Sequence, residues 1–265
     1  MRDALIVSLL SLVPRNAGAR WMGAFARTRV SAWCTRAFVW AYGVDLAEAE
    51  PGPYPTLEAL FTRRLLPSAR PIDPDPGALV SPVDGRCAFV GRSAAGRIPL
   101  GPGAGLDLPT LLGAPVDGER DVCVLYLSPR DYHRVHAPAA GRATGWWYQP
   151  GTLWPVFPAA VRRVENLFAR NERAGVTLET DAGPLAVVLV GAFGVGRITL
   201  EGADLCTNTG GAAVRAPSAQ VYARGGPLGV FHLGSTVVLV APPGVWRWTV
   251  GAGEVVRLGR SIAAR

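Results

Sequence analysis

Short runs of β-branched and other apolar residues dominate the chain from about residue 79 onward, and Gly, Pro or Asp separates one run from the next. Examples are DVCVLYLS, LAVVLVGAFGVGRITL, STVVLVAP and GEVVRLG. Runs of this length and composition are typical of strands. The 32 Gly and 23 Pro among 265 residues favour many turns over a helical bundle. We therefore predict an α+β fold in which N-terminal helices precede a mostly antiparallel β-sheet or barrel-like core, with one later helix in PAAVRRVENLFARNE.

The first 50 residues have a different character. Residues 1–14 hold a short apolar run that ends at Pro14, and we expect an interfacial helix there rather than a secretory signal. Residues 20–45 have helical spacing, and their apolar stripe is formed by Trp21, Met22, Phe25, Ala32, Trp33, Val39 and Trp40. Six Arg against two Asp make residues 1–45 basic, which suits an anionic membrane surface. Packing of the stripe on the protein core is the alternative.

All 27 basic residues of the chain are Arg. Without Lys the protein cannot hold pyridoxal phosphate as a lysine imine. The four Cys show no CxxC pairing, which indicates free thiols and gives no zinc signature. The charge outside the N-terminal part is dispersed, and no nucleic-acid-binding motif is present. We expect no nucleic-acid partner.

Three polar positions interrupt the apolar runs. His133 and His136 lie in SPRDYHRVHAP, where they are either structural or catalytic, and an HxxH pair alone is a weak metal signal. Asp84 of VSPVDGR is either part of a hairpin turn or an acid that orients a histidine. Ser235 of FHLGSTVVLV is a candidate nucleophile. We prefer His136 to His232 as its base, because strand alternation places His232 and Ser235 on opposite faces.

Seven segments, taken in order, give the chain a strong likeness to a known family. They resemble the motifs of the phosphatidylserine decarboxylases, which are pyruvoyl-dependent membrane enzymes. The segments are FTRRLLPSARPID, VSPVDGR, YLSPRDYHRVHAP, PGTLWPVFP, VENLFARNER, GPLAVVLVGAFGVG and GVFHLGSTVVLV.

The resemblance implies that the chain cuts itself between Gly234 and Ser235. A large chain 1–234 (β) and a small chain 235–265 (α) would remain together as a heterodimer, and association of two such pairs is left open. Ser235 would become the covalent pyruvoyl cofactor. Asp84 matches the family's acid and His136 its base, while His133 is implied as a proton donor during decarboxylation. No metal is implied.

The same resemblance implies a substrate and a location. Phosphatidylserine would form an imine with the pyruvoyl carbonyl, lose CO₂ and leave as phosphatidylethanolamine. The enzyme would be a peripheral protein on the cytoplasmic face of the cell membrane, with residues 1–50 as the membrane-associating segment and 51–265 as the catalytic domain. Pro227 departs from the family pattern, because an acid is usual there.

Two other functions stay open at this stage. One is a pyruvoyl decarboxylase of another serine phospholipid or of an amino acid. The other is an unprocessed lipid-binding relative without activity. A serine hydrolase is disfavoured, because processing would destroy Ser235.

Overall fold

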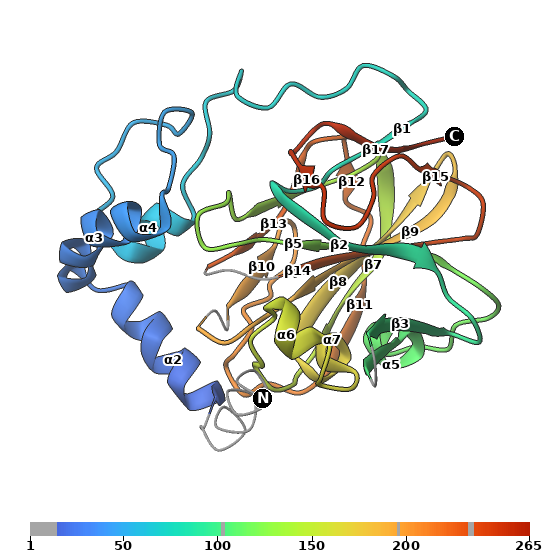
Figure 1. Cartoon of the computed structure of the whole chain (residues 1–265), viewed down its shortest axis with the longest axis horizontal. Helices are drawn as coiled ribbons and strands as arrows, with labels where there is room; N and C mark the ends of the chain where they lie inside the picture. Colours follow the sequence, from blue (N-terminus) through green and yellow to red (C-terminus); the bar gives the residue numbers. More distant parts are fainter. Residues whose placement is uncertain (1–14, 102–103, 195–196, 233–235) are drawn as a thin grey trace.

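The computed structural model describes residues 15–101, 104–194, 197–232 and 236–265. The N-terminal helices lie together on one side of the molecule, and the strands form its main body (Figure 1). These helices are α2 (Arg15–Ala26), the 3₁₀ helix η1 (Arg29–Ser31), α3 (Ala32–Tyr42) and α4 (Leu57–Phe61). Because residues 1–14 lie outside the described residues, the predicted interfacial helix there is not tested.

Nine strands form the main sheet, and every neighbouring pair in it is antiparallel. Their order is β11-β7-β8-β9-β14-β5-β2-β16, and β12 also pairs with β7. The strands are β2 (Gly85–Arg92), β5 (Asp121–Tyr126), β7 (Gly141–Gln149), β8 (Arg173–Thr180), β9 (Gly183–Val190), β11 (Val214–Pro217), β12 (Val221–Tyr222), β14 (Thr236–Ala241) and β16 (Val255–Val256).

Three smaller sheets surround the main one. One has the order β10-β13-β6, with β10 (Ile198–Leu200), β13 (Pro227–Phe231) and β6 (Arg134–His136). A second has the order β1-β17-β15, with β1 (Ala78–Val80), β17 (Ser261–Ala264) and β15 (Arg247–Trp248). The third is the pair β3 (Arg97–Gly101) and β4 (Ala104–Asp107). Short helices α5 (Leu108–Leu112), α6 (Pro158–Val161) and α7 (Leu167–Arg170) complete the described elements.

Strand β14 explains why the sequence carries continuous apolar runs rather than alternating ones. All six of its residues are buried. Val237 and Leu239 belong to one hydrophobic cluster, whereas Val238 and Val240 belong to another. Because successive side chains of a strand point to opposite faces, β14 has a core on each side.

The predicted α+β class and the antiparallel sheet are confirmed. The barrel-like alternative is wrong for the described residues, since the nine-stranded sheet stays open between β16 at one edge and β11 and β12 at the other. The single later helix expected in PAAVRRVENLFARNE is also wrong. It is split into α6 and α7, because Asn166 adopts a left-handed conformation with φ of 56° between them.

The N-terminal apolar stripe lies on two helices rather than one. Its three Trp side chains face outward, with exposed fractions of 78% for Trp21, 88% for Trp33 and 87% for Trp40. The alternative in which the whole stripe packs on the core is therefore wrong. Phe38 of α3 instead makes the inward contact, with its ring centroid 4.9 Å from that of Phe61.

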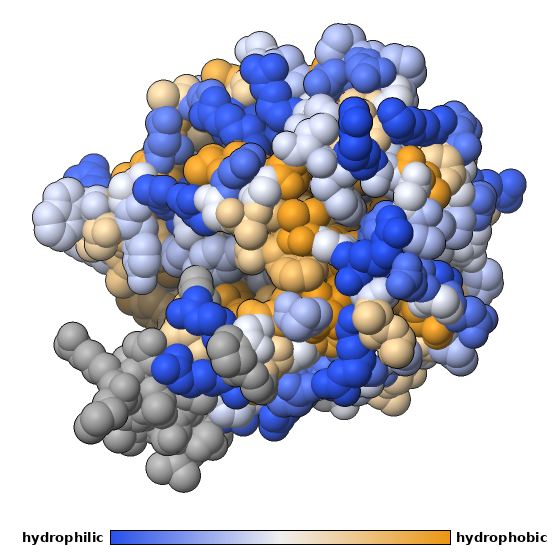
Figure 2. Space-filling view, turned by 45° about the vertical axis from the view of Figure 1, so that its right-hand side comes forward, coloured by the Kyte–Doolittle hydropathy of each residue, from blue (hydrophilic) through white to orange (hydrophobic). Residues whose placement is uncertain are grey.

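Figure 2 shows a face on which an apolar strip crosses the middle and hydrophilic side chains border it. No helix within the described parts of the chain is both long enough and apolar enough to cross a membrane.

Candidate active site

Four strand ends meet beside the predicted cleavage point. Strand β14 begins at Thr236, which pairs with Tyr126 at the end of β5 and with Val190 at the end of β9. Tyr126 in turn pairs with Arg86 at the start of β2. Gly234 and Ser235 lie outside the described residues, but Thr236 places the start of β14 at this end of the strands.

Asp84 lies directly before β2, at the same end of the strands. It does not form the hairpin turn that its sequence suggested, because β1 pairs with β17 and β2 pairs with β5. Gly85 allows the close approach of β2 to β5. A Cβ atom at position 85 would lie 2.3 Å from the carbonyl oxygen of Tyr126, so any larger residue would push the two strands apart.

The chain changes sheets across the predicted cleavage point. Strand β13 belongs to the three-stranded sheet and β14 to the nine-stranded sheet. On the β13 side, the backbone N–H of Phe231 donates to the carbonyl of His133 at 3.0 Å, and that of His232 donates to Arg197 at 3.0 Å. The residues before and after 233–235 are therefore held by different sheets.

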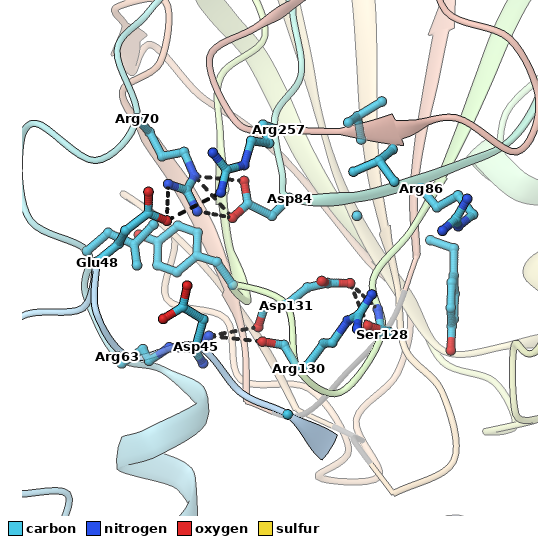
Figure 3. Close-up of a pocket in the computed structure, with 17 residues that line it drawn as sticks. Asp45, Glu48, Arg63, Arg70, Asp84, Arg86, Ser128, Arg130, Asp131 and Arg257 are labelled. Atoms are coloured by element: carbon cyan, nitrogen blue, oxygen red, sulfur yellow. Dashed lines mark hydrogen bonds and ion pairs between the residues drawn. The ribbon is translucent and has the colours of Figure 1, made fainter. Parts of the chain in front are cut away.

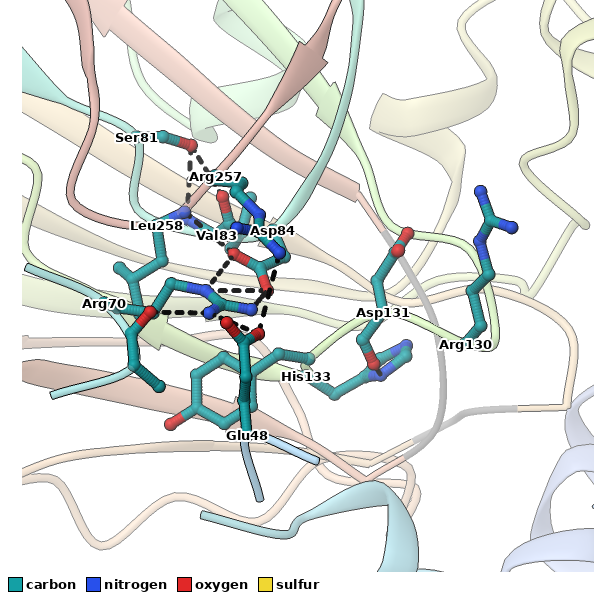
Figure 4. A network of polar contacts seen from close by, with 12 residues as sticks. Glu48, Arg70, Ser81, Val83, Asp84, Arg130, Asp131, His133, Arg257 and Leu258 are labelled. Carbon is teal, nitrogen blue, oxygen red and sulfur yellow. Dashed lines mark hydrogen bonds and ion pairs between the residues drawn. The ribbon is translucent and has the colours of Figure 1, made fainter. Parts of the chain in front are cut away.

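Asp84 is buried and fully engaged by two other groups (Figure 4). Arg70 donates from Nε to Oδ1 at 3.0 Å and from Nη2 to Oδ2 at 2.7 Å, and the backbone N–H of Leu258 donates to Oδ1 at 2.8 Å. Arg70 also forms an ion pair of 2.7 Å with Glu48. Bidentate guanidinium–carboxylate pairs of this kind fix geometry as well as charge.

His136 is held by partners other than Asp84. Its Nδ1 lies 2.8 Å from the carbonyl oxygen of Gly225, which can only accept, so Nδ1 carries the proton. Nε2 is then the acceptor and lies 3.2 Å from the hydroxyl of Tyr132. Burial lowers the pKa of His136, and the charge of Arg134 adds to this, while the Gly225 hydrogen bond and Asp84 oppose it. The imidazole is neutral, with its basic nitrogen free of a proton.

The direct Asp84–His136 hydrogen bond that we expected is therefore not formed. Arg70 and Leu258 occupy the Asp84 carboxylate, and the Gly225 carbonyl takes the N–H that Asp84 was expected to orient. Asp84 acts on His136 through charge, since it raises the pKa of the imidazole without a hydrogen bond. His136 carries its proton on Nδ1, as expected for a base that acts through Nε2, but the Gly225 carbonyl rather than Asp84 sets this tautomer.

His133 is completely buried. Its Nδ1 donates to the carbonyl of Asp131 at 2.8 Å, and its Nε2 has no hydrogen-bond partner among the described residues. Burial, and then the charge of Arg63, lower the pKa of His133 to about 3. Phe61 contacts the ring edge-on, with centroids 5.1 Å apart. A buried acceptor without a partner is rare and points to a functional role.

Beside a small cavity of about 240 Å³ that Thr236 lines, two larger cavities adjoin this end of the strands. One, of about 330 Å³, is polar and is lined by Arg63, Arg70, Asp84 and Arg130 among others (Figure 3). The other, of about 410 Å³, is apolar and extends to the N-terminal helices. Its lining includes Met22, Phe38, Phe61, Leu127 and Phe193. Tyr126, the β5 partner of Thr236, lines both.

Sequence reasoning missed several residues of this site. Arg70 and Glu48, which hold Asp84, and Tyr132, which bonds His136, had no role assigned. Tyr132 lies within the YHRVH motif and Arg70 within SARPID, so both were in segments already singled out. Glu48 carried no signal. Within the described ranges, no three His, Cys, Asp or Glu side chains gather where they could hold a metal ion.

Comparison with known proteins defines the class. The family model described as phosphatidylserine decarboxylase matches residues 57–264. The chain is 41% identical to the phosphatidylserine decarboxylase proenzyme of Anaeromyxobacter sp. (strain K) and 42% identical to that of Myxococcus xanthus (strain DK1622), each over 99% of both chains. It is 47% identical to the proenzyme of Halorhodospira halophila (strain DSM 244 / SL1), over 86% of this chain and 81% of the other.

The matched model covers most of the chain, including Asp84, His133 and His136 but not Glu48. The class is therefore that of the carboxy-lyases. The chain belongs to the phosphatidylserine decarboxylase family.

Proposed function

We propose that this chain is the proenzyme of a phosphatidylserine decarboxylase, which cuts itself and then converts phosphatidylserine into phosphatidylethanolamine and CO₂. The observation that carries the proposal is the family match across the residues that meet at the β2, β5 and β14 ends. Asp84, His133 and His136 all lie in that matched region.

Self-cleavage needs a base that is unprotonated at neutral pH. Neutral His136 supplies one, because its Nε2 is an acceptor and burial disfavours its charged form. It takes the proton of the Ser235 hydroxyl as the oxygen attacks the Gly234 carbonyl, which moves the acyl group from nitrogen to oxygen. Elimination then releases Gly234 as a carboxylate, and hydrolysis of the remaining dehydroalanine releases ammonia. The chains 1–234 and 235–265 result.

A pyruvoyl group at position 235 fits its surroundings. Its carbonyl supplies an electron sink for decarboxylation. Two buried polar atoms, Nε2 of His133 and Oγ1 of Thr236, have no hydrogen-bond partner among the described residues. Nε2 of neutral His133 is an acceptor, so the donor role implied by the resemblance requires this nitrogen to gain a proton first.

The two cavities suit an amphiphilic substrate. Five Arg and four acidic side chains line the polar cavity. Its Arg offer donors to the phosphate and carboxylate of a headgroup, and the apolar cleft offers space for the first part of an acyl chain. They adjoin at Tyr126, beside the start of β14. The outward-facing Trp33 and Trp40 on α3, the helix that also lines the apolar cleft, support a position of this cleft next to a membrane surface. The enzyme works as a peripheral protein on the cytoplasmic face of an anionic membrane.

Intact mass under denaturing conditions tests the proposal. The purified protein should give two species that match residues 1–234 and 235–265, with the smaller one lighter than a peptide that begins with serine. Ser235→Ala should give one full-length species. Turnover of phosphatidylserine, measured beside free serine, then separates a phospholipid decarboxylase from an amino-acid decarboxylase. A folded wild-type chain that stays uncut would overturn the proposal.

A further inference from the structure

The third histidine of the chain lies three residues before Ser235 and has a carboxylate partner. Nδ1 of His232 lies 2.8 Å from Oε1 of Glu58, and its Nε2 lies 3.2 Å from the hydroxyl of Thr199. Arg197 donates from Nη1 to the same Glu58 oxygen at 3.2 Å. The side chains of Glu58 and His232 are only 20% and 16% exposed. Neither the self-cleavage step nor decarboxylation, as derived above, uses this pair.

The chemistry of the partners defines the protonation. A carboxylate only accepts, so Nδ1–H of His232 donates to Glu58. The groups that face the imidazole are Glu58 from α4, Arg197 and Thr199 at β10, and Arg134 from β6. Burial and then Arg197 lower the pKa of His232, and Glu58 opposes them. A neutral imidazole that bridges Glu58 and Thr199 satisfies every partner.

Glu58 itself is held firmly. The side chain of Thr56 accepts from the backbone N–H of Ala59 at 3.0 Å and so caps the start of α4. The hydroxyl of buried Ser31, in η1, accepts from the backbone N–H of Leu57 at 2.8 Å. The pair therefore connects the N-terminal helical layer to the strand that leads into the cleavage point.

We propose that the Glu58–His232 pair is a positioning device for self-cleavage, an inference that rests on the proposed function. The Thr236 end of the cleaved segment is held by hydrogen bonding to strands on both sides. On the other side, His232 is held by one backbone hydrogen bond to Arg197 and by side-chain contacts with Glu58 and Thr199. Intramolecular attack needs the reacting atoms aligned, and a displacement of about 1 Å costs up to about 100-fold in rate. The pair supplies that alignment.

A time course of cleavage during cell-free synthesis of the full chain tests this role. Glu58→Ala should lengthen the half-time of cleavage by about 10- to 100-fold, whereas Glu58→Gln, which keeps an acceptor for Nδ1–H, should recover most of the rate. The double variant Glu58→Ala with His232→Ala should cleave no more slowly than the slower of the two single variants, because each single substitution already removes the same Glu58–His232 interaction. Glu165→Gln is the matched control. Glu165 also bridges an arginine and a backbone N–H, but its partners are Arg97 of β3 and Gly105 of β4. The Glu165→Gln variant should therefore cleave at the wild-type rate.

The cleaved fraction gives a second readout. Decarboxylation per pyruvoyl group should stay within about twofold of wild type in Glu58→Ala, because the pair acts before the cofactor exists. Equal cleavage half-times for wild type and Glu58→Ala would overturn the proposal, and so would additive effects in the double variant. A matching loss of activity per pyruvoyl group would also overturn it, by showing general damage to the site. A wild-type chain that never cleaves would instead overturn the proposed function.

Discussion

The buried, neutral state of His133 makes the folded chain sensitive to acid. Its pKa falls from 6.5 to about 3 on folding, with burial as the main cause and Arg63 as the second. Between these two pH values the unfolded chain binds a proton that the folded chain does not. The contribution of His133 to stability is therefore complete above about pH 6.5 and is lost progressively as the pH falls toward 3.

The size of the effect follows from linkage. Each pH unit in this window costs about 1.4 kcal/mol, so acidification from pH 7 to pH 5 removes about 2 kcal/mol of unfolding free energy through this one residue. His133→Asn keeps an N–H for the Asp131 carbonyl but has no group that titrates in this range. The variant should lack this part of the pH dependence.

Urea unfolding followed by circular dichroism at pH 7, 6 and 5 measures the difference. Both proteins should carry Ser235→Ala, so that each unfolds as one uncut chain. The difference in unfolding free energy between the two proteins should change by about 2 kcal/mol from pH 7 to pH 5. His136 and His232 titrate in both proteins, so their contributions cancel in this difference. Parallel curves for the two proteins would refute a buried, neutral His133.

Three further predictions concern processing and membrane binding. His136→Ala should leave one uncut chain by intact mass, because no other base is placed for the Ser235 hydroxyl, and efficient cleavage would remove it from that role. His133→Ala should cleave but decarboxylate at least about 100-fold more slowly per pyruvoyl group, and normal turnover would exclude it from the proton transfers. Trp33→Ala combined with Trp40→Ala should weaken sedimentation with anionic vesicles by at least about tenfold, whereas unchanged binding would place the membrane contact elsewhere.

The sequence alone determined the strands and the class of the sheet. A run such as residues 237–241 is apolar at every position, which is typical of a strand with a core on both faces. His133 and His136 were identified because two histidines in one polar segment after an apolar strand are uncommon in a chain with only three. These features are local, so composition and spacing were enough to find them.

The helix boundaries depended on competing local hydrogen bonds. The N-terminal helix breaks because the Thr28 hydroxyl donates to Phe25 at 2.7 Å and the Ser31 hydroxyl donates to Ala26 at 3.0 Å. Such side-chain bonds to the backbone offer an alternative to continued helix. Periodicity showed the apolar stripe but not this interruption, and only the packed structure placed its Trp side chains outward.

The partners in the site were decided by tertiary structure alone. The motifs suggested Asp84 as the partner of His136, yet Arg70 takes the carboxylate and the Gly225 carbonyl takes the imidazole N–H. The same is true of Glu58 and His232, which are 174 residues apart in the chain. A sequence supplies the groups that can bond, but each buried donor has several acceptors of suitable chemistry. Which one it meets depends on how the sheets and helices pack.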